Sequence, residues 1–176
     1  MKRVYFIGLV IAAMLIVSVM PAVAQRGDDT KRLSKNGKVE GTIDGVKVTL
    51  EYGRPKVKGR QIWGDLVPFD KVWRTGADEA TTFTIDKDIK VEGKKLAAGT
   101  YGLFTIPGKT EWTIIFNKVA KQWGAFKYNS GEDVLRVMVK PAAAENVEEM
   151  TFKIEGNKLL LCWEKLCVPI VISAAM

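Results

Sequence analysis

The sequence predicts an all-β protein, an antiparallel β-sandwich in which a jelly-roll-like connectivity stays open. Short stretches alternate apolar and polar residues with the period of two that is expected of strands with one buried face. Glycine-centred turns such as Asp44-Gly45 separate these stretches. Only short stretches, such as residues 142–147, suit a helical turn.

Each expected strand has an inward-facing set of apolar residues at alternate positions. Glycine turns at Glu92-Gly93 and Ala98-Gly99 precede the inward residues that begin at Leu96 and at Tyr101. The inward residues are Val46, Val48, Leu50 and Tyr52, then Thr81, Phe83 and Ile85, then Ile89, Val91 and Leu96, then Tyr101–Ile106, then Trp112, Ile114 and Phe116, and finally Leu135, Val137 and Val139.

Two tight turns predict the register of the C-terminal strands as a three-stranded meander. Gly156-Asn157 and Glu164-Lys165 both suit two-residue hairpin turns. With both turns in place, one face of the meander is wholly apolar, and a one-residue slip would expose that face. The predicted pairs are Glu155 with Lys158, Ile154 with Leu159, Phe152 with Leu161, Met150 with Trp163, Trp163 with Leu166, Leu161 with Val168, and Leu159 with Ile170.

The same register places Cys162 opposite Cys167 on the other face of the meander. They form a non-hydrogen-bonded pair, whose close spacing is compatible with a disulfide. Two free thiols are the alternative, and a redox pair is disfavoured because no C-x-x-C occurs. We therefore predict a structural disulfide.

The N-terminus has the features of a secretory signal peptide. Lys2 and Arg3 precede an apolar run to Met20, and Ala22-Val23-Ala24 forms an A-x-A cleavage site. We expect residues 1–24 to be removed, residues 25–38 to form a flexible leader and residues 39–176 to form a single β domain. The expected location is the periplasm or the extracellular medium, with no stable membrane insertion after processing. An uncleaved membrane anchor is the alternative.

The charge of the mature chain is mild and dispersed. Without the signal peptide 25 basic and 20 acidic residues remain, a formal net charge of +5. Nucleic acid is a poor partner for such a chain, because phosphate binding usually needs a clustered basic face.

The chain contains no histidine. Ser-His-Asp triads, Cys-His pairs and most catalytic zinc or copper sites need an imidazole, and two cysteines on a hairpin cannot hold zinc alone. Phosphate-cradling glycine motifs are absent as well. We therefore expect no metal and no cofactor.

Carboxylate chemistry stays open, with Glu79 as the weak catalytic candidate. Asp78 and Glu79 are adjacent, so on a strand they would point to opposite faces and could not flank one bond. Glu79 is in phase with the inward residue Thr81, where a carboxylate needs a partner or solvent. Arg74 is the nearest candidate, and a bridge from it to Asp78 or Glu79 would pin the loop.

The segment from Arg54 to Glu79 looks most like a binding region. It is long and irregular, and it interleaves aromatic with basic residues. The alternative is that Trp63, Phe69 and Trp73 plug one end of the sandwich while the basic side chains are solvated. The candidate binding residues are Arg54, Lys58, Arg60, Trp73, Arg74, Asp78 and Glu79, with Trp123 and Tyr128 as added aromatics.

Several blocks of the chain resemble a known family. Residues 52–84, with RPKVKGR and WRTGADE, are followed by KKLAAGTYGLFTIPGKTEWTIIFNK, WGAFKY and DVLRVMVKP. Over about residues 38–172 the chain resembles the exported bacterial family called domain of unknown function 2911. The resemblance implies an exported β-sandwich-like domain without an assigned activity. Its pattern WRTGA-[ND]-E has Asn in many relatives where this chain has Asp78, and the two cysteines look like a local feature.

The resulting functional hypothesis is non-catalytic binding in the bacterial cell envelope or outside it. The ligand would be an envelope glycan, an anionic polymer or a protein. One alternative is a glycan hydrolase that uses Glu79, and another is an interaction module whose strand edge pairs with a second protein. The sequence makes no prediction of the oligomeric state.

Overall fold

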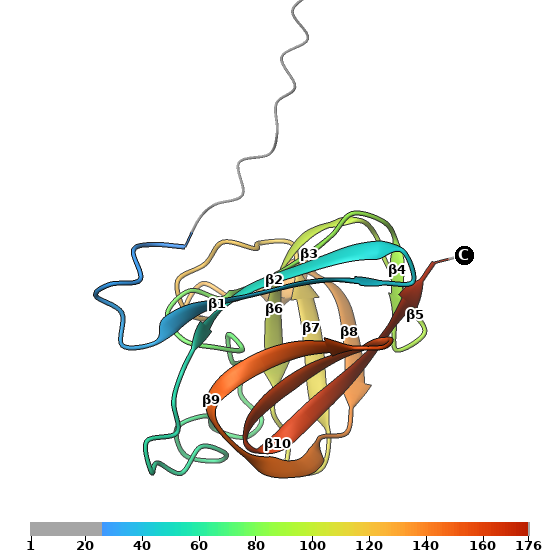
Figure 1. The fold of residues 1–176 in the computed structure, drawn as a ribbon. Helices are drawn as coiled ribbons and strands as arrows, with labels where there is room; N and C mark the ends of the chain where they lie inside the picture. Colours follow the sequence, from blue (N-terminus) through green and yellow to red (C-terminus); the bar gives the residue numbers. More distant parts are fainter. Residues whose placement is uncertain (1–25, 176) are drawn as a thin grey trace, which may run out of the picture.

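The computed structural model describes residues 26–175 and shows two antiparallel sheets packed around one core (Figure 1). The described part has a single short 3-10 helix, Ser130–Glu132, and none of its helices is long and apolar enough to cross a membrane. The predicted all-β antiparallel sandwich is confirmed. The predicted signal peptide lies outside the described residues. The strands are β1 (Lys35–Ile43), β2 (Val46–Arg54), β3 (Thr81–Ile85), β4 (Ile89–Val91), β5 (Lys94–Leu96), β6 (Gly99–Ile106), β7 (Trp112–Asn117), β8 (Asp133–Val139), β9 (Ala142–Glu155) and β10 (Lys158–Ala174).

The larger sheet has six strands in the order β1-β2-β3-β6-β7-β8. Its inner face carries the predicted alternating residues; for example, Leu50 on β2 lies opposite Phe83 on β3, and both are fully buried. β1 pairs with β2 along its whole length, around a turn in which Asp44 and Gly45 have positive φ angles of 48° and 74°. β1 begins at Lys35, so the strand includes the last residues of the segment expected to be a leader.

The second sheet has the element order β5-β4-β10-β9. The first predicted hairpin is confirmed, because Ile154 pairs with Leu159 and Phe152 with Leu161. The apolar face is also confirmed: it is buried along both β9 and β10, at Met150, Phe152, Leu159, Leu161, Trp163, Val168, Ile170 and Ile172.

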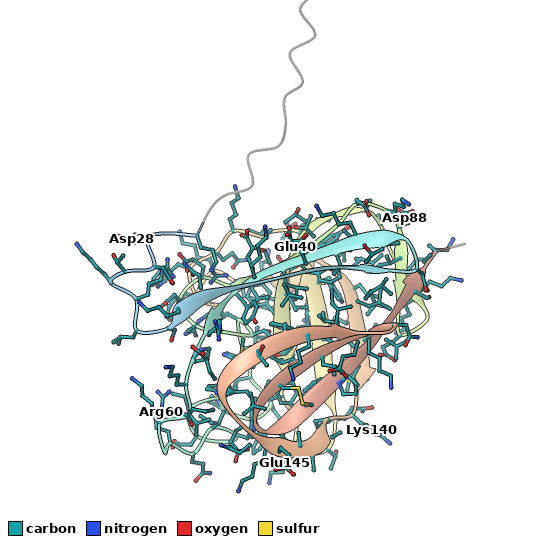
Figure 2. All side chains as sticks on the ribbon, viewed as in Figure 1. Asp28, Glu40, Arg60, Asp88, Lys140 and Glu145 are labelled. Atoms are coloured by element: carbon teal, nitrogen blue, oxygen red, sulfur yellow. A yellow bond between two sulfur atoms is a disulfide. The ribbon has the colours of Figure 1, made fainter. Side chains whose placement is uncertain are left out.

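β10 folds back on itself at the second predicted turn. The Cα atoms of Cys162 and Cys167 are 4.1 Å apart, whereas five residues of straight strand would span roughly 16 Å. Farther from the turn, the Ile172 N–H donates to the Asn157 carbonyl at 2.8 Å, which fits the same register. Cys162 and Cys167 form the predicted disulfide at this tip, visible as a yellow bond in Figure 2.

β9 wraps around the tip of the β10 hairpin (Figure 1). Its start pairs with the far side of the tip, where Ala142 lies opposite Cys167, and Val147 lies opposite Glu164. Residues 142–147 are therefore strand and not the helical turn that they suited in sequence. The ladder shifts register beyond Cys162 in order to follow this bend, and the Met150 N–H donates to the Pro55 carbonyl at 2.9 Å. The predicted pairing of Met150 with Trp163 was wrong for this reason.

Four tryptophans pack against one another in the core, and two of them, Trp63 and Trp73, come from the irregular segment. Trp63 contacts Trp112 edge-on at 4.9 Å between ring centroids, and Trp73 stacks on Trp163 at 5.9 Å with 19° between the ring planes. A second, smaller cluster lies on the outer face of the larger sheet, around Phe104. Its other members are Ala80 and Ile115, with Val72, Ile106, Ala125 and Tyr128 packed against them.

Candidate functional site

Two loops meet on the outer face of the larger sheet. The Ala80 N–H donates to the Gln122 carbonyl at 2.9 Å, and the Gly124 N–H donates to the Asp78 carbonyl at 2.9 Å. These bonds place Glu79 opposite Trp123 in an isolated antiparallel bridge. The small cluster around Phe104 supports both loops from below, so their relative position is set by packing as well as by hydrogen bonds.

The loop Trp73–Ala80 is tightly wound, and two of its non-glycine residues have left-handed backbone. Thr75 has φ 56° and Asp78 has φ 62°. Positive φ is costly for a β-branched residue, and Thr75 is held by full burial and by its hydroxyl, 3.2 Å from that of Thr105. Asn and Asp are the side chains that best tolerate this conformation, so Asp78 suits its position.

The Glu79 carboxylate is paired with two arginines that precede β1. Arg32 binds both of its oxygens, at 2.5 and 2.6 Å, and Arg26 reaches one of them at 3.3 Å. The hydrogen bonds from Arg32, opposed by partial desolvation, lower the pKa of Glu79 to about 2. Arg74 makes no ion pair within residues 26–175. The bridge that the sequence suggested from Arg74 to Asp78 or Glu79 is replaced by the pairs that Arg26 and Arg32 make with these carboxylates.

Arg26 lies in a cradle of backbone carbonyl groups. Its two terminal nitrogens donate to the carbonyl oxygens of Glu79 at 2.8 Å, Glu51 at 3.0 Å, and Ala77 and Ala80 at 3.3 Å each. Only 7% of its side chain is exposed. Burial is the main effect on this guanidinium and lowers the pKa of Arg26, while the Glu79 charge opposes that shift.

Next to Glu79 is an open pocket of about 260 Å³, here called the Trp123 pocket. The Trp123 indole is 62% exposed, and the Gln122 side chain is buried with its Oε1 atom unpartnered among the described residues. Gln122 as a residue lines the pocket, and its side-chain Nε2 donates to the Val119 carbonyl at 2.9 Å. The lining residues are Arg26, Glu51, Glu79, Ala80, Thr82, Ala120, Lys121, Gln122 and Trp123.

A second open pocket, of about 610 Å³, lies on the other side of Arg26 and is here called the arm pocket. Arg26 and Glu51 line both pockets, so these two residues stand between them. The remaining lining of the arm pocket comes from Gly27, Asp28 and Asp29 together with the start of β1 and Lys38.

The basic residues at the start of the irregular segment lie elsewhere. Arg54 pairs with Glu149 at 2.6 Å, and the Lys58 N–H donates to the Glu148 carboxylate at 2.9 Å. The Arg60 guanidinium donates to the carbonyls of Val57 and Lys56. In the view of Figure 2, Asp28, which lines the arm pocket, lies at the upper left, and Arg60, which does not line it, lies at the lower left. The candidate binding residues therefore do not converge on one pocket.

The aromatic candidates are divided in the same way. Trp73 is buried, and its indole N–H donates to the Gly76 carbonyl at 3.2 Å, so it belongs to the core plug with the half-buried Trp63. Arg74 is half-buried, and desolvation lowers its pKa.

Tyr128 supports the loop and does not line the Trp123 pocket. Its hydroxyl donates to Asp133 at 2.6 Å, its ring packs 5.0 Å from that of Phe104, and burial raises the pKa of Tyr128 to about 12. Only Glu79 and Trp123 among the sequence candidates line this pocket.

Sequence reasoning missed the other polar and charged residues at the site, among them Arg26, Arg32, Glu51, Lys121 and Gln122. The two arginines are in the segment expected to be a leader, and no local pattern links them to Glu79 fifty residues later. Within the described range, no group of three or more potential metal-ligating side chains comes together.

Comparison with known proteins gives one match. The model of the family described as "Protein of unknown function (DUF2911)" matches residues 34–172, which is most of the chain. No curated protein and no solved structure matches. The chain therefore belongs to the DUF2911 family, as the blocks around Arg54–Arg60 and Trp73–Glu79 suggested.

Proposed function

We propose that this protein is an exported, non-catalytic carbohydrate-binding domain, and that the Trp123 pocket holds the sugar. The observation that carries the proposal is an exposed indole in an open pocket that polar and charged side chains also line. A flat aromatic face can cover the apolar side of a sugar ring, while nearby polar atoms bind its hydroxyl groups.

The balance of charges favours a neutral ligand over an anionic polymer. Two carboxylates, Glu51 and Glu79, and two cations, Arg26 and Lys121, line the pocket. A sugar hydroxyl can both donate and accept, so it can use either kind of partner. A polyanion would be repelled by the two carboxylates.

The pKa of Glu79 favours binding over hydrolysis. A glycosidase needs one carboxylic acid with a raised pKa in order to protonate the leaving group. The pKa of Glu79 is instead lowered to about 2, so this side chain stays ionised at any physiological pH. An ionised carboxylate that arginine holds in place can accept hydrogen bonds from the hydroxyl groups of a sugar.

A panel of soluble neutral oligosaccharides, titrated by calorimetry against the mature protein, tests the proposal. For a sugar that binds, Trp123→Ala should weaken affinity about tenfold, since one aromatic contact contributes about 1–1.5 kcal/mol. Phe126→Ala is the matched control, because Phe126 is 89% exposed in the same loop but does not line the pocket. Failure of the whole panel to bind, or equal losses in both variants, would refute the proposal.

Export is part of this proposal. The A-x-A site predicts a mature chain that starts at Gln25, in the periplasm or the medium. Mass spectrometry of the protein recovered from each fraction checks it, and a chain that retains Met1 in the membrane fraction would contradict it.

A further inference from the structure

The acceptors around Arg26 match the two terminal nitrogens of an arginine side chain, while its Nε is buried without a partner among the described residues. Four carbonyl oxygens and the Glu79 carboxylate receive five hydrogen bonds from the two terminal nitrogens of one guanidinium. A guanidinium spreads its donors over a planar fork, whereas the ammonium group of lysine carries three donors on one atom. A lysine could therefore not reach the same set of acceptors.

The cradle is built by the fold and not by the arginine. The Thr81 N–H donates to the Arg74 carbonyl at 3.1 Å, and the Thr81 hydroxyl donates to the Thr75 carbonyl at 2.7 Å. Close packing against β2 adds to this, because a Cβ atom on Gly53 would lie 2.2 Å from the Ala77 oxygen. None of these contacts involves the guanidinium, so the fold supplies them independently of Arg26.

The segment that supplies Arg26 is attached more weakly. Residues 26–34, here called the arm, belong to no strand, and among the described residues the arm is tied to the rest of the chain mainly by side-chain contacts. Those are the bonds of Arg26 and Arg32, the Asn36 N–H on the Asp29 carboxylate at 2.6 Å, and the side chains of Lys35 and Asn36 on the carbonyls of Asp29 and Gly27 at 2.7 and 3.1 Å. Opening of the arm therefore costs chiefly these polar contacts, because Leu33, its one large apolar side chain, is 90% exposed.

Departure of the arm would leave buried acceptors without donors. The carbonyls of Ala77, Glu79 and Ala80 and the Glu79 carboxylate would lose their guanidinium partner, which is unfavourable unless another donor replaces it. We propose that the loop Trp73–Ala80, with the Glu51 carbonyl, is a binding site for an arginine side chain, that Arg26 is its resident occupant, and that arginine on another extended peptide can replace it.

Exchange of the occupant would also change the neighbouring surface. Arg26 lies between the Trp123 pocket and the arm pocket, so its departure joins them into one groove with Glu51 and Glu79 on its walls. A peptide bound there would have room on both sides of its arginine. This inference does not depend on the sugar proposal, although both sites share Glu79.

Chemical rescue tests the site. In the full mature chain, Arg26→Ala should lower the melting temperature, and N-acetyl-arginine methylamide should restore it. At ten times its dissociation constant the analogue should raise the melting temperature by about 3–6 °C, since it binds only the folded state. The matched lysine analogue should have little effect, and neither compound should stabilise the unsubstituted protein, whose cradle is full.

A titration separates replacement of the arm from simple stabilisation. A synthetic peptide of residues 25–34 should bind the Arg26→Ala, Arg32→Ala double variant measured by calorimetry, and the same peptide with alanine in place of both arginines should not. Glu79→Gln added to the variant should weaken binding at least tenfold, whereas Glu145→Gln, at an exposed carboxylate far from the arm, should not. If Arg26→Ala does not fold by itself, refolding that requires the arginine analogue supports the site. Equal effects of the arginine and lysine analogues, or no effect of either, overturn it. Sugar titrations use a different readout, so the two proposals fail separately.

Discussion

Trp73 and Trp123 stand next to basic or polar residues in sequence, yet they lie in opposite surroundings. Trp73 is buried and stacks on Trp163 of β10, whereas Trp123 is mostly exposed above a pocket. The difference arises from the strands that lie beneath each residue. Trp73 bridges to Thr105 at the end of β6 and enters the core, while Trp123 bridges to Glu79 on the outer face of the same sheet.

This comparison shows that an aromatic residue in a long loop has no functional meaning until its partners are known. The tryptophan cluster and the Trp123 pocket both use parts of the segment between Arg54 and Glu79. Trp63 and Trp73 of that segment pack in the core, and its last residue, Glu79, lines the Trp123 pocket. If the two regions are as separate as their packing indicates, a substitution in one should leave the other unchanged.

The largest contrast is expected between two tryptophan substitutions. Trp163→Ala should lower the free energy of unfolding by about 3–5 kcal/mol, because it removes a fully buried ring from the cluster. Trp123→Ala should change it by less than about 0.5 kcal/mol, as for other surface positions. Urea denaturation of both variants measures the difference, and similar losses would contradict the assignment of Trp123 to a site.

β2 and the loop Trp73–Ala80 make their closest contact at Gly53, here called the seam. In Gly53→Ala the new Cβ would meet the Ala77 oxygen at 2.2 Å, so β2 or the loop Trp73–Ala80 must shift. We expect a loss of about 2–3 kcal/mol in the free energy of unfolding. Asp78→Asn in the same loop is the control and should cost less than about 0.5 kcal/mol, because Asn tolerates the same backbone. Thermal unfolding of both variants checks this, and an unperturbed Gly53→Ala would mean that the seam is loose.

The disulfide should affect the core side alone. Replacing Cys162 and Cys167 together by alanine should lower the free energy of unfolding by about 2 kcal/mol, since the closed loop is short. Sugar or peptide binding should not change, because neither cysteine lines a pocket described here. A thiol count on the unreduced, denatured protein is the companion measurement, and two free thiols would refute the bond.

Acid should weaken the stabilisation that comes from the Glu79 carboxylate and its two arginines. Because the pKa of Glu79 is lower in the folded chain, about 2, than the ordinary value of 4.5, its stabilisation is fully present above about pH 4.5. It is lost as the pH falls toward 2. We expect a contribution on the order of 1–2 kcal/mol, allowing for solvent screening at a carboxylate that is 27% exposed. Glu79→Gln should remove this part of the pH dependence, and identical acid profiles for the two proteins would contradict the pairing with Arg26 and Arg32.

Local patterns were sufficient for much of the fold. Alternation at Val46–Tyr52 and Trp112–Phe116 predicted buried strand faces, since a period of two depends only on neighbouring residues. The turns at Gly156-Asn157 and Glu164-Lys165 predicted the disulfide tip for the same reason. The predicted pairing of Met150 with Trp163 was wrong because β9 bends around that tip. At the bend the Met150 N–H donates to the carbonyl of Pro55, in a segment far away in the sequence.

The candidate site was predictable only in part. Glu79 stood out as a carboxylate near the start of a strand, and Trp123 as an aromatic in a polar loop. Their meeting depends on two hydrogen bonds between residues more than forty positions apart. The occupancy of the site depends on Arg26, which comes from a segment that looked like a leader.

The sequence by itself determined most of the strands, their inward faces, the two C-terminal turns and the absence of histidine, because these follow from residue types and short spacings. It did not determine the starts of β1 and β9, which were expected to be a leader and a helical turn. Only the tertiary structure decided which tryptophans are core and which is exposed, and which arginines bind Glu79. The physical reason is that burial and ion pairing are properties of residues brought together across the chain, and local composition does not encode those partners.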